Sequence, residues 1–232
     1  MNSLRPVAEA PGSGYSGRML TISAPMLLRA YAAGIFPMAE SAASRELHWF
    51  DPERRGILPL DGFHVARSLR KTVRRGPFEI RCDSAFRAVI EHCAETTEDR
   101  PKTWINDDII RLYTTLFEAG YAHSVECWRD GRLVGGLYGV SIGAAYFGES
   151  MFSRETGASK VALVHLVARL RAAGFTLLDT QFVTDHLSHF GAVEIPRAEY
   201  RRRLNRALER KTDFAAVDQA QAVAALLDRP PA

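Results

Sequence analysis

The chain has 232 residues, of which 47% are hydrophobic and 25% are charged, and its formal net charge is +3. This length accommodates one large domain, or one large and one small domain, and so small a charge does not by itself indicate a nucleic-acid partner. The longest uncharged run, residues 133–148, contains five glycines and therefore predicts strands instead of a membrane span. Residues 1–17 are rich in Pro, Gly and Ala without the apolar segment of a secretory signal, so we expect a flexible N-terminus on a cytoplasmic protein.

The three cysteines are Cys82, Cys93 and Cys127. Their spacing is not typical of metal ligands, and three thiols cannot all pair with one another, which favours a reducing compartment. We expect all three to have packing roles.

A helix is the first predicted element. Ser23 is a candidate N-cap residue, Pro25 follows at an early helical position, and Gly34 ends the pattern. We expect this helix to start a small N-terminal domain of residues 1–59, followed by a larger domain of residues 60–232.

Trp49 stands at the beginning of a turn-rich segment that continues to Gly62. An exposed tryptophan beside a turn either stacks on a ligand such as a nucleic-acid base or packs between two domains. The residues alone leave both interpretations open.

The most charged helix candidate covers residues 61–75. Its basic residues fall at helical spacing on one face, apart from the apolar positions. They are Arg67, Arg70, Lys71 and Arg74. Such a stripe is often only a solvated face, but four cations without an interleaved acid match a phosphate backbone better than a salt-bridged surface.

Two core helices follow. We expect Asp83 and Ser84 to cap the first, and Asn106 and Asp107 to cap the second, which ends at Gly120. Both carry a regular apolar stripe that is typical of a helix with one buried face.

The hydrophobic period then changes to two. It predicts a meander with strands at residues 122–128, 133–141 and 144–149, joined by an Asp-Gly turn and a second glycine turn. Glu149 would therefore end a strand.

A helix around residues 161–170 and a short strand at residues 176–180 come next, with Gly174 between them. Because side chains alternate along a strand, Asp179 and Gln181 should share one face and form part of a catalytic cleft. A meander, a helix and a returning strand are the order of an acyltransferase-type (GNAT-like) α/β fold. This fold has a splayed mixed sheet flanked by helices, here with a small N-terminal domain.

The C-terminal part adds positive charge. Pro196 opens a helix that contains several arginines between Arg197 and Arg206, and an alanine-rich tail follows from Asp213. We expect this tail to be helical at most and frayed around residues 229–231.

Several separate blocks, in order, resemble the leucyl/phenylalanyl-tRNA–protein transferase family over roughly residues 30–205. They are Trp104-Ile105, His123-Ser124-Val125-Glu126, Gly148-Glu149-Ser150-Met151-Phe152-Ser153, Asp179-Thr180-Gln181 and Gly191-Ala192-Val193-Glu194-Ile195-Pro196-Arg197. The resemblance implies transfer of Leu or Phe, and less well Met, from aminoacyl-tRNA to the N-terminal Arg or Lys of acceptor proteins, which marks them for degradation. It implies no ATP, metal or other cofactor, and we expect a monomer.

The resemblance also implies roles for individual residues. Asp179 would orient the attacking amine, Gln181 would position it, and Glu149 would bind the cationic acceptor. The aminoacyl side chain and the terminal adenosine would contact apolar and aromatic residues. These are Trp49, Trp104, Leu137, Tyr146, Leu166 and Leu170.

Three alternatives remain open from the residues. His186 and His189 beside Asp185 could suggest a metal, although no third ligand has convincing spacing, and capping by Thr184 and Asp185 also explains this segment. The run Arg154-x-x-Gly157-x-Ser159 is similar to the pyrophosphate loop of an acyl-CoA-dependent N-acetyltransferase. A non-catalytic RNA-binding module explains the basic stripe but leaves the acidic residues without a role.

Overall fold

The computed structural model describes residues 22–39, 41–42, 44, 47–96 and 102–228, and it contains a two-stranded and a seven-stranded sheet. The predictions for residues 1–17 and 229–231 lie outside this range. The small sheet pairs β1 (Phe36–Ala39) with β2 (Leu47–Phe50) in antiparallel fashion. None of the described helices is long and apolar enough to cross a membrane.

The large sheet has the strand order β4-β5-β6-β7-β8-β3-β9. Its pairs are antiparallel except for β7 and β8, which run parallel, so the sheet is mixed. The strands are β3 (Arg54–Ile57), β4 (Glu79–Cys82), β5 (Ala122–Arg129), β6 (Arg132–Ile142), β7 (Ala145–Ser153), β8 (Leu177–Gln181) and β9 (Val193–Pro196).

The β5–β7 meander matches the three strands that the period of two predicts, but β7 is longer than expected. Its pairing with β6 continues to Gly135 opposite Ser153. Glu149 therefore lies within the strand, and the prediction that it ends the strand is wrong. The sequence pattern was misleading because the polar residues Glu149 and Ser150 interrupt an otherwise apolar run.

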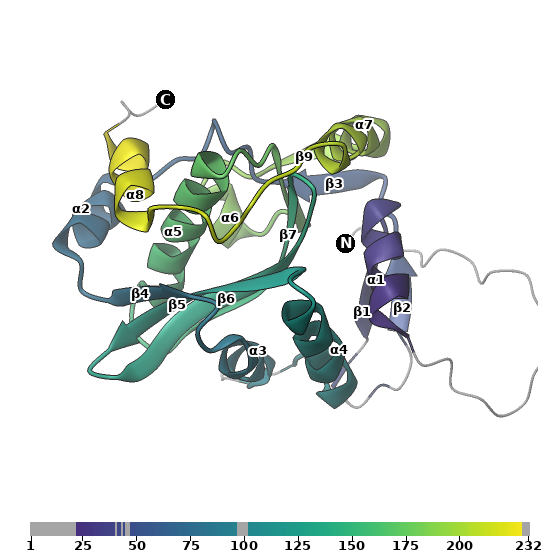
Figure 1. Ribbon diagram of the computed structural model, residues 1–232, viewed down its shortest axis with the longest axis horizontal. Helices are drawn as coiled ribbons and strands as arrows, with labels where there is room; N and C mark the ends of the chain where they lie inside the picture. Colours follow the sequence, from purple (N-terminus) through teal and green to yellow (C-terminus); the bar gives the residue numbers. More distant parts are fainter. Residues whose placement is uncertain (1–21, 40, 43, 45–46, 97–101, 229–232) are drawn as a thin grey trace, which may run out of the picture.

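The strands β7 and β8 pair over a short stretch and then part. Their register runs only from Ala145 opposite Leu177 to Phe147 opposite Asp179, whereas β7 continues to Ser153. This confirms the splayed mixed sheet, and Figure 1 shows the curved path of β7.

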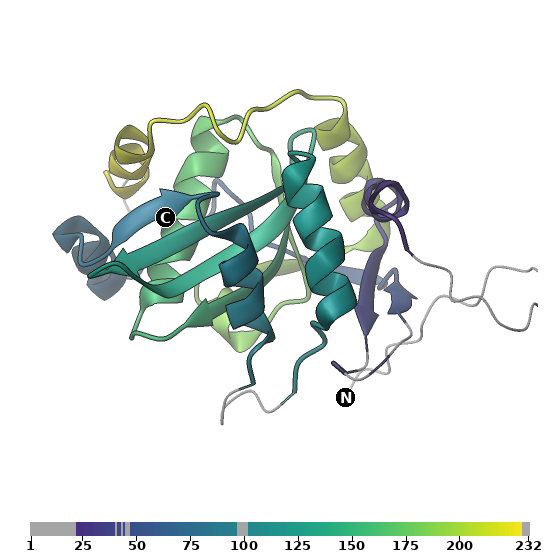
Figure 2. The same ribbon diagram turned by 60° about the horizontal axis from the view of Figure 1, so that its bottom comes forward.

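Helices cover both faces of this sheet. In Figure 2, α3 and α4 lie across the near face, whereas α5 lies behind it. The helix α8 packs against α5, and α1 stands beside β1 at the N-terminal end of the molecule. The helices are α1 (Ala24–Ala32), α2 (Arg67–Arg75), α3 (Phe86–Ala94), α4 (Asp107–Glu118), α5 (Ala158–Ala172), α6 (Asp185–Ser188), α7 (Arg197–Leu208) and α8 (Gln219–Leu227).

The two layers bury separate cores because strand side chains alternate between faces. On β5 and β6, Val125 and Leu137 pack into the core below α5, whereas Tyr138 and Val140 pack into the core below α3 and α4. The alanine-rich tail forms α8, whose apolar side chains join the core of α5. This explains why α5 is apolar on nearly all sides.

Two predicted helix starts need correction. The helix expected at residues 61–75 begins only at Arg67, because the segment before it bonds elsewhere and His64 N donates to the Phe190 carbonyl at 3.0 Å. The expectation that Asp83 and Ser84 cap the next helix is also wrong, because α3 begins at Phe86 with Ala85 at the N-cap and no side-chain cap bond. The amides of Ser84 and Ala85 instead donate to the buried carboxylate of Glu126 at 3.0 and 2.8 Å.

The other expected helix ends are present. The Asn106 side chain accepts a hydrogen bond from Ile109 N and caps α4, and Thr184 caps α6 in the same way. Gly34, Gly120 and Gly174 have positive φ angles of 81°, 77° and 82°, which suit glycine at the ends of helices.

The segment around Trp49 differs from the predicted turn. Trp49 lies in β2 opposite Pro37, and it is partly buried against the core. The boundary that we place at residue 59 assigns β3 to the N-terminal unit, whereas β3 pairs with β8 and β9 in the large sheet. Short strands of this kind carry little sequence signal, because their pairing partners are distant in the chain.

Candidate active site

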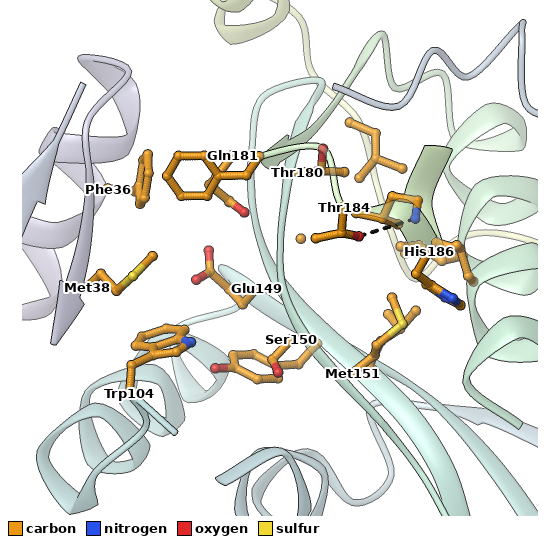
Figure 3. Close-up of a pocket in the computed structure, with 18 of the residues that line it drawn as sticks. Phe36, Met38, Trp104, Glu149, Ser150, Met151, Thr180, Gln181, Thr184 and His186 are labelled. Carbon is orange, nitrogen blue, oxygen red and sulfur yellow. Dashed lines mark hydrogen bonds between the residues drawn. The ribbon is translucent and has the colours of Figure 1, made fainter. Parts of the chain in front are cut away.

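A cavity of about 330 Å³ opens where β7 and β8 part. The strands, α5, the N-terminal unit and the segment after β8 all contribute to its wall (Figure 3). The lining residues are Phe36, Pro37, Met38, Trp104, Leu137, Tyr138, Gly148, Glu149, Ser150, Met151, Leu163, Leu166, Leu178, Thr180, Gln181, Phe182, Thr184, His186 and Leu187.

The cavity wall has regions of different chemistry. Phe36, Met38 and Trp104 form one side, and leucine side chains from α5, β8 and α6 form the other. Glu149 and Gln181 lie between these regions, and Figure 3 shows their side chains pointing toward one another across the cavity. A bound molecule can therefore place an apolar group on one side and an aromatic group on the other, with its polar centre in the middle.

A β-bulge sets the direction of Glu149. Tyr138 faces Ser150 while the next residue, Gly139, faces Gly148, so Glu149 is the extra residue on β7. Bulges re-aim side chains and are frequent at active sites. Gly139 is needed here because a Cβ atom at that position would lie 2.3 Å from the Phe147 carbonyl oxygen.

Two tyrosine hydroxyls hold the Glu149 carboxylate. Tyr31 of α1 donates to Oε1 at 2.7 Å, Tyr113 of α4 donates to Oε2 at 3.1 Å, and the two hydroxyl oxygens are 2.5 Å apart. Burial raises the pKa of Glu149 to about 7, because removal from water outweighs the hydrogen bonds that favour the charged form. Glu149 can therefore change its charge near neutral pH.

Gln181 occupies an unusual backbone conformation at the end of β8. Its φ angle is +58°, and Phe182 N donates to the Thr180 carbonyl at 2.6 Å, which closes a three-residue turn. Such turns with positive φ are rare and strained, and strain of this kind is found at functional sites. Within the described residues, the buried Nε2 of Gln181 has no hydrogen-bond partner, so its amide is available to a ligand in the cavity.

Asp179 is fully buried and does not line the cavity. Its carboxylate accepts hydrogen bonds from Arg55, from the Tyr200 hydroxyl at 2.6 Å and from Gln181 N at 2.8 Å. The expectation that Asp179 and Gln181 both face the cleft from one side of a strand is therefore wrong. The turn at Gln181 breaks the alternation of side chains on which that expectation depended.

The predicted aminoacyl-adenosine contacts divide into two groups. Leu137, Leu166 and Trp104 line the cavity, as expected. Tyr146 and Leu170 are fully buried in the core instead, and Trp49 packs outside the lining.

Several lining residues and the two tyrosines are not among the residues predicted from the sequence. Met151 is two positions after Glu149 on β7, and Leu163 is three positions before Leu166 on α5, so strand and helix periods could have identified them. Nothing local to Tyr31 or Tyr113 indicates a contact with Glu149, which is 118 and 36 positions away in the chain, respectively.

The basic stripe lies on α2, but half of it contacts the C-terminal helix. Arg70 donates to the Leu227 carbonyl at the end of α8, and Arg74 pairs with Asp228 at 3.2 Å. Arg67 and Lys71 are exposed, and no ion pair joins either of them to another described residue. These two residues are the part of the stripe that a polyanion can reach without displacing the tail.

The two histidines after β8 differ in their contacts. His189 Nδ1 lies 2.5 Å from the Asp185 carbonyl oxygen, whereas the His186 ring packs against Phe190 and its buried Nε2 atom has no hydrogen-bond partner among the described residues. In the part of the chain that the structure describes, no group of three or more His, Cys, Asp and Glu side chains is arranged to hold a metal ion.

The loop that is similar to a pyrophosphate-binding loop has its amides bonded internally. Arg154 N and Glu155 N both donate to the Val134 carbonyl, and Ser159 N donates to the Ser153 hydroxyl at 3.3 Å. A coenzyme A pyrophosphate would need these amides as donors. The loop therefore gives the acetyl-CoA hypothesis no support.

The parted mixed sheet and its cavity, with two polar side chains facing each other, define an α/β protein with a candidate active site between two strands. The family model "Leucyl/phenylalanyl-tRNA protein transferase" matches residues 57–205, and the model of its N-terminal domain matches residues 21–53. A leucyl/phenylalanyl-tRNA–protein transferase of Paramagnetospirillum magneticum is 65% identical over 190 residues, which are 82% of this chain and 91% of that protein. The chain belongs to the leucyl/phenylalanyl-tRNA–protein transferase family, which confirms the resemblance.

Two solved structures show only distant likeness. The structure of L-PGS from Bacillus licheniformis has a TM-score of 0.37 and 12% identity, and it covers 68% of this chain and 53% of that chain. The C-terminal domain of a putative lysylphosphatidylglycerol synthetase from Agrobacterium fabrum has a TM-score of 0.39 and 13% identity. The match covers 90% of this chain and 70% of that chain. Neither structure bears on the site.

Proposed function

We propose that this protein transfers leucine or phenylalanine, and less well methionine, from aminoacyl-tRNA to the N-terminal Arg or Lys of acceptor proteins in an N-degron pathway. The observation that carries the proposal is the cavity in which Glu149 and Gln181 face one another between an apolar and an aromatic region. These regions match the parts of an aminoacyl-adenosine and a cationic amine acceptor.

The apolar side of the cavity accepts the aminoacyl side chain. Leu163, Leu166 and Leu178 surround a space without a charged partner, which suits leucine, phenylalanine or methionine. An apolar pocket separates side chains that differ by one methylene by only about 1–3 kcal/mol, so slower use of methionine is expected. Trp104 on the opposite side offers a surface on which the terminal adenine can stack.

Glu149 binds the cationic acceptor. A carboxylate at the centre of the cavity attracts the guanidinium or ammonium group of an N-terminal Arg or Lys and keeps its α-amine near the ester. The hydroxyl groups of Tyr31 and Tyr113 hold the Glu149 carboxylate in place by hydrogen bonds, so the carboxylate needs little reorganisation when the acceptor binds.

The chemical step requires orientation more than activation. The α-amine of the acceptor has an ordinary pKa of about 7.7–8.0, so a useful fraction is neutral near pH 7. Its lone pair attacks the ester carbonyl carbon, the bond to the ribose oxygen breaks, and the amine proton leaves with the ribose hydroxyl or through solvent. Ester to amide is downhill, so the step needs no ATP.

Gln181 acts on the reacting centre. Its Nε2 group is a buried donor that can hydrogen-bond the carbonyl oxygen as negative charge develops there. Asp179 has a supporting role in this proposal, because its carboxylate holds the backbone of Gln181 and does not reach the cavity.

A direct assay tests the proposal. Purified protein is mixed with radiolabelled leucyl-tRNA and a peptide that begins with Arg, and in parallel with labelled acetyl-CoA and the same peptide. We expect label on the Arg peptide from leucyl-tRNA, and none on a matched peptide whose N-terminus is acetylated. Label from acetyl-CoA alone would contradict the proposal.

A further inference from the structure

A buried arginine that the sequence analysis did not single out lies behind the cavity. Arg55 of β3 is 1% exposed, and its Nε and Nη2 groups contact the two Asp179 oxygens at 2.9 and 2.7 Å. Its third nitrogen, Nη1, donates to the Gly34 carbonyl at 3.1 Å. Each of the three guanidinium nitrogens therefore donates a hydrogen bond within the protein.

The same guanidinium is stacked between two aromatic rings. Its Cζ atom lies 4.4 Å from the ring centroid of Phe36 and 4.5 Å from that of Tyr200. Burial lowers the pKa of Arg55, but the facing Asp179 carboxylate raises it by more, so the guanidinium stays charged. Because Phe36 also lines the cavity, Arg55 connects the wall of the N-terminal unit with the end of β8.

Asp179 has little acceptor capacity left for chemistry. A carboxylate offers about four lone-pair sites, and these accept from Arg55, the Tyr200 hydroxyl and Gln181 N. The Asp179 carboxylate instead fixes the position of the backbone at Gln181. Its Oδ1 atom accepts a hydrogen bond from the backbone amide of this strained residue at 2.8 Å.

The residue after Arg55 supports the same turn. Gly56 lies opposite Gln181, and a Cβ atom at Gly56 would lie 2.5 Å from the carbonyl carbon of Phe182. The absence of a side chain therefore lets β3 approach the turn closely. Two adjacent residues of β3 thus support the turn at Gln181. Gly56 allows the close approach, and Arg55 acts through Asp179.

We propose that Arg55 and Tyr200 are positioning residues of the transfer reaction, which hold Gln181 in its turned conformation through the Asp179 carboxylate. This rests on the proposed function, in which Gln181 contacts the ester. Misplacement of a reacting group by about 1 Å can slow an enzyme about a hundredfold, so a network that fixes one backbone turn has a large effect on rate.

The variant Arg55→Lys tests the bidentate contact between the Arg55 guanidinium and the Asp179 carboxylate. Lysine keeps the charge but cannot bridge both Asp179 oxygens and the Gly34 carbonyl. We expect kcat of leucine transfer to fall by about tenfold or more, with KM for leucyl-tRNA and the tRNA dissociation constant within about twofold of wild type. Tyr200→Phe, which removes one hydroxyl and keeps the stacked ring, should lower kcat by about threefold to tenfold.

The matched control is Arg54→Lys. Arg54 precedes Arg55 on the same strand, but its side chain is 58% exposed and pairs with Glu194 at 3.1 Å. We expect it to keep the kcat of wild type. Thermal unfolding and near-ultraviolet circular dichroism identify which variants are folded.

The kinetic comparison decides between positioning and general support. A folded Arg55→Lys variant with the kcat of wild type would overturn the proposal, as would a rise in KM with kcat unchanged. If Arg55→Lys does not fold, Tyr200→Phe decides, and an unchanged kcat in that variant has the same meaning. Lack of transfer by the wild-type protein would instead refute the proposed function itself.

Discussion

Two carboxylates lie near the end of β8, and their surroundings differ. Asp179 is paired with a guanidinium and is fully buried, whereas Glu149 is half-buried and held by neutral hydroxyl groups. Burial of a carboxylate whose hydrogen-bond donors are neutral favours its protonated form. The raised pKa of Glu149 therefore makes this carboxylate sensitive to pH near neutrality.

The first prediction concerns acceptor binding. The pKa of Glu149 is raised to about 7, so its charged form becomes dominant as pH rises through 7. We expect KM for an Arg-initiated peptide to fall between pH 6 and pH 8 by about tenfold more in the wild type than in Glu149→Gln, in which only the α-amine of the peptide titrates. The ratio of the two profiles removes the contribution of the α-amine, which titrates equally in both assays.

The same pKa predicts a stability effect with a definite sign. Because the folded pKa of Glu149 lies above its ordinary value of 4.5, its protonation stabilises the folded state below pH 4.5, and this contribution is lost as pH rises through 7. Glu149→Gln should be more stable than wild type at pH 8, with a smaller difference at pH 5. Thermal unfolding at both values measures this, and equal shifts at pH 5 and pH 8 would show that Glu149 does not titrate in this range.

At the scale of elements, α2 and α8 share a surface. Arg70 and Arg74 bind the end of α8, and the buried Arg169 of α5 donates to the Phe214 carbonyl at 2.6 Å in the connection before α8. The tail is therefore fixed at both ends. Reversal of Arg70 and Arg74 would disturb tail docking as well as any contact with tRNA.

Arg67→Glu combined with Lys71→Glu is the cleaner variant for tRNA binding. If these residues contact phosphates, tRNA affinity should fall about tenfold, and the slope of log affinity against log salt should become shallower by roughly 1.4–1.8. Filter binding of tRNA at several salt concentrations measures both quantities. The rate at saturating aminoacyl-tRNA should stay unchanged because both residues are on α2, which contributes nothing to the cavity lining.

Glu118→Lys with Glu209→Lys provides an opposite charge change on other elements, and it should leave the salt slope unaltered. An unaltered affinity and slope in the Arg67 and Lys71 variant would show that the stripe on α2 is a solvated face. The arginines of α7 would then be the next candidates for tRNA contact.

At the scale of the whole molecule, sequence patterns predicted the elements better than their contacts. Glycine and asparagine signals at Gly34, Asn106 and Gly174 predicted helix ends because those signals are local. The meander was predictable for the same reason, since adjacent strands joined by short turns leave a period of two in the sequence.

The site was only partly predictable because its geometry depends on distant residues. The bulge at Glu149 and the turn at Gln181 break the alternation on which strand reasoning relies. Arg55 meets Asp179 across 124 positions of the chain, and no local pattern indicates that pair. The family resemblance pointed to Glu149, Asp179 and Gln181, and of these three Glu149 and Gln181 line the cavity whereas Asp179 does not.

The central claim of this account is that Gln181 acts on the ester inside the cavity. The single-turnover rate of leucine transfer at saturating protein and Arg peptide tests it most directly, with Gln181→Ala compared to wild type and to Gln221→Ala on the exposed face of α8. The account predicts that Gln181→Ala lowers this rate by about a hundredfold or more while tRNA affinity stays within about twofold, and that Gln221→Ala changes neither. A folded Gln181→Ala protein that transfers leucine at the wild-type rate would contradict it.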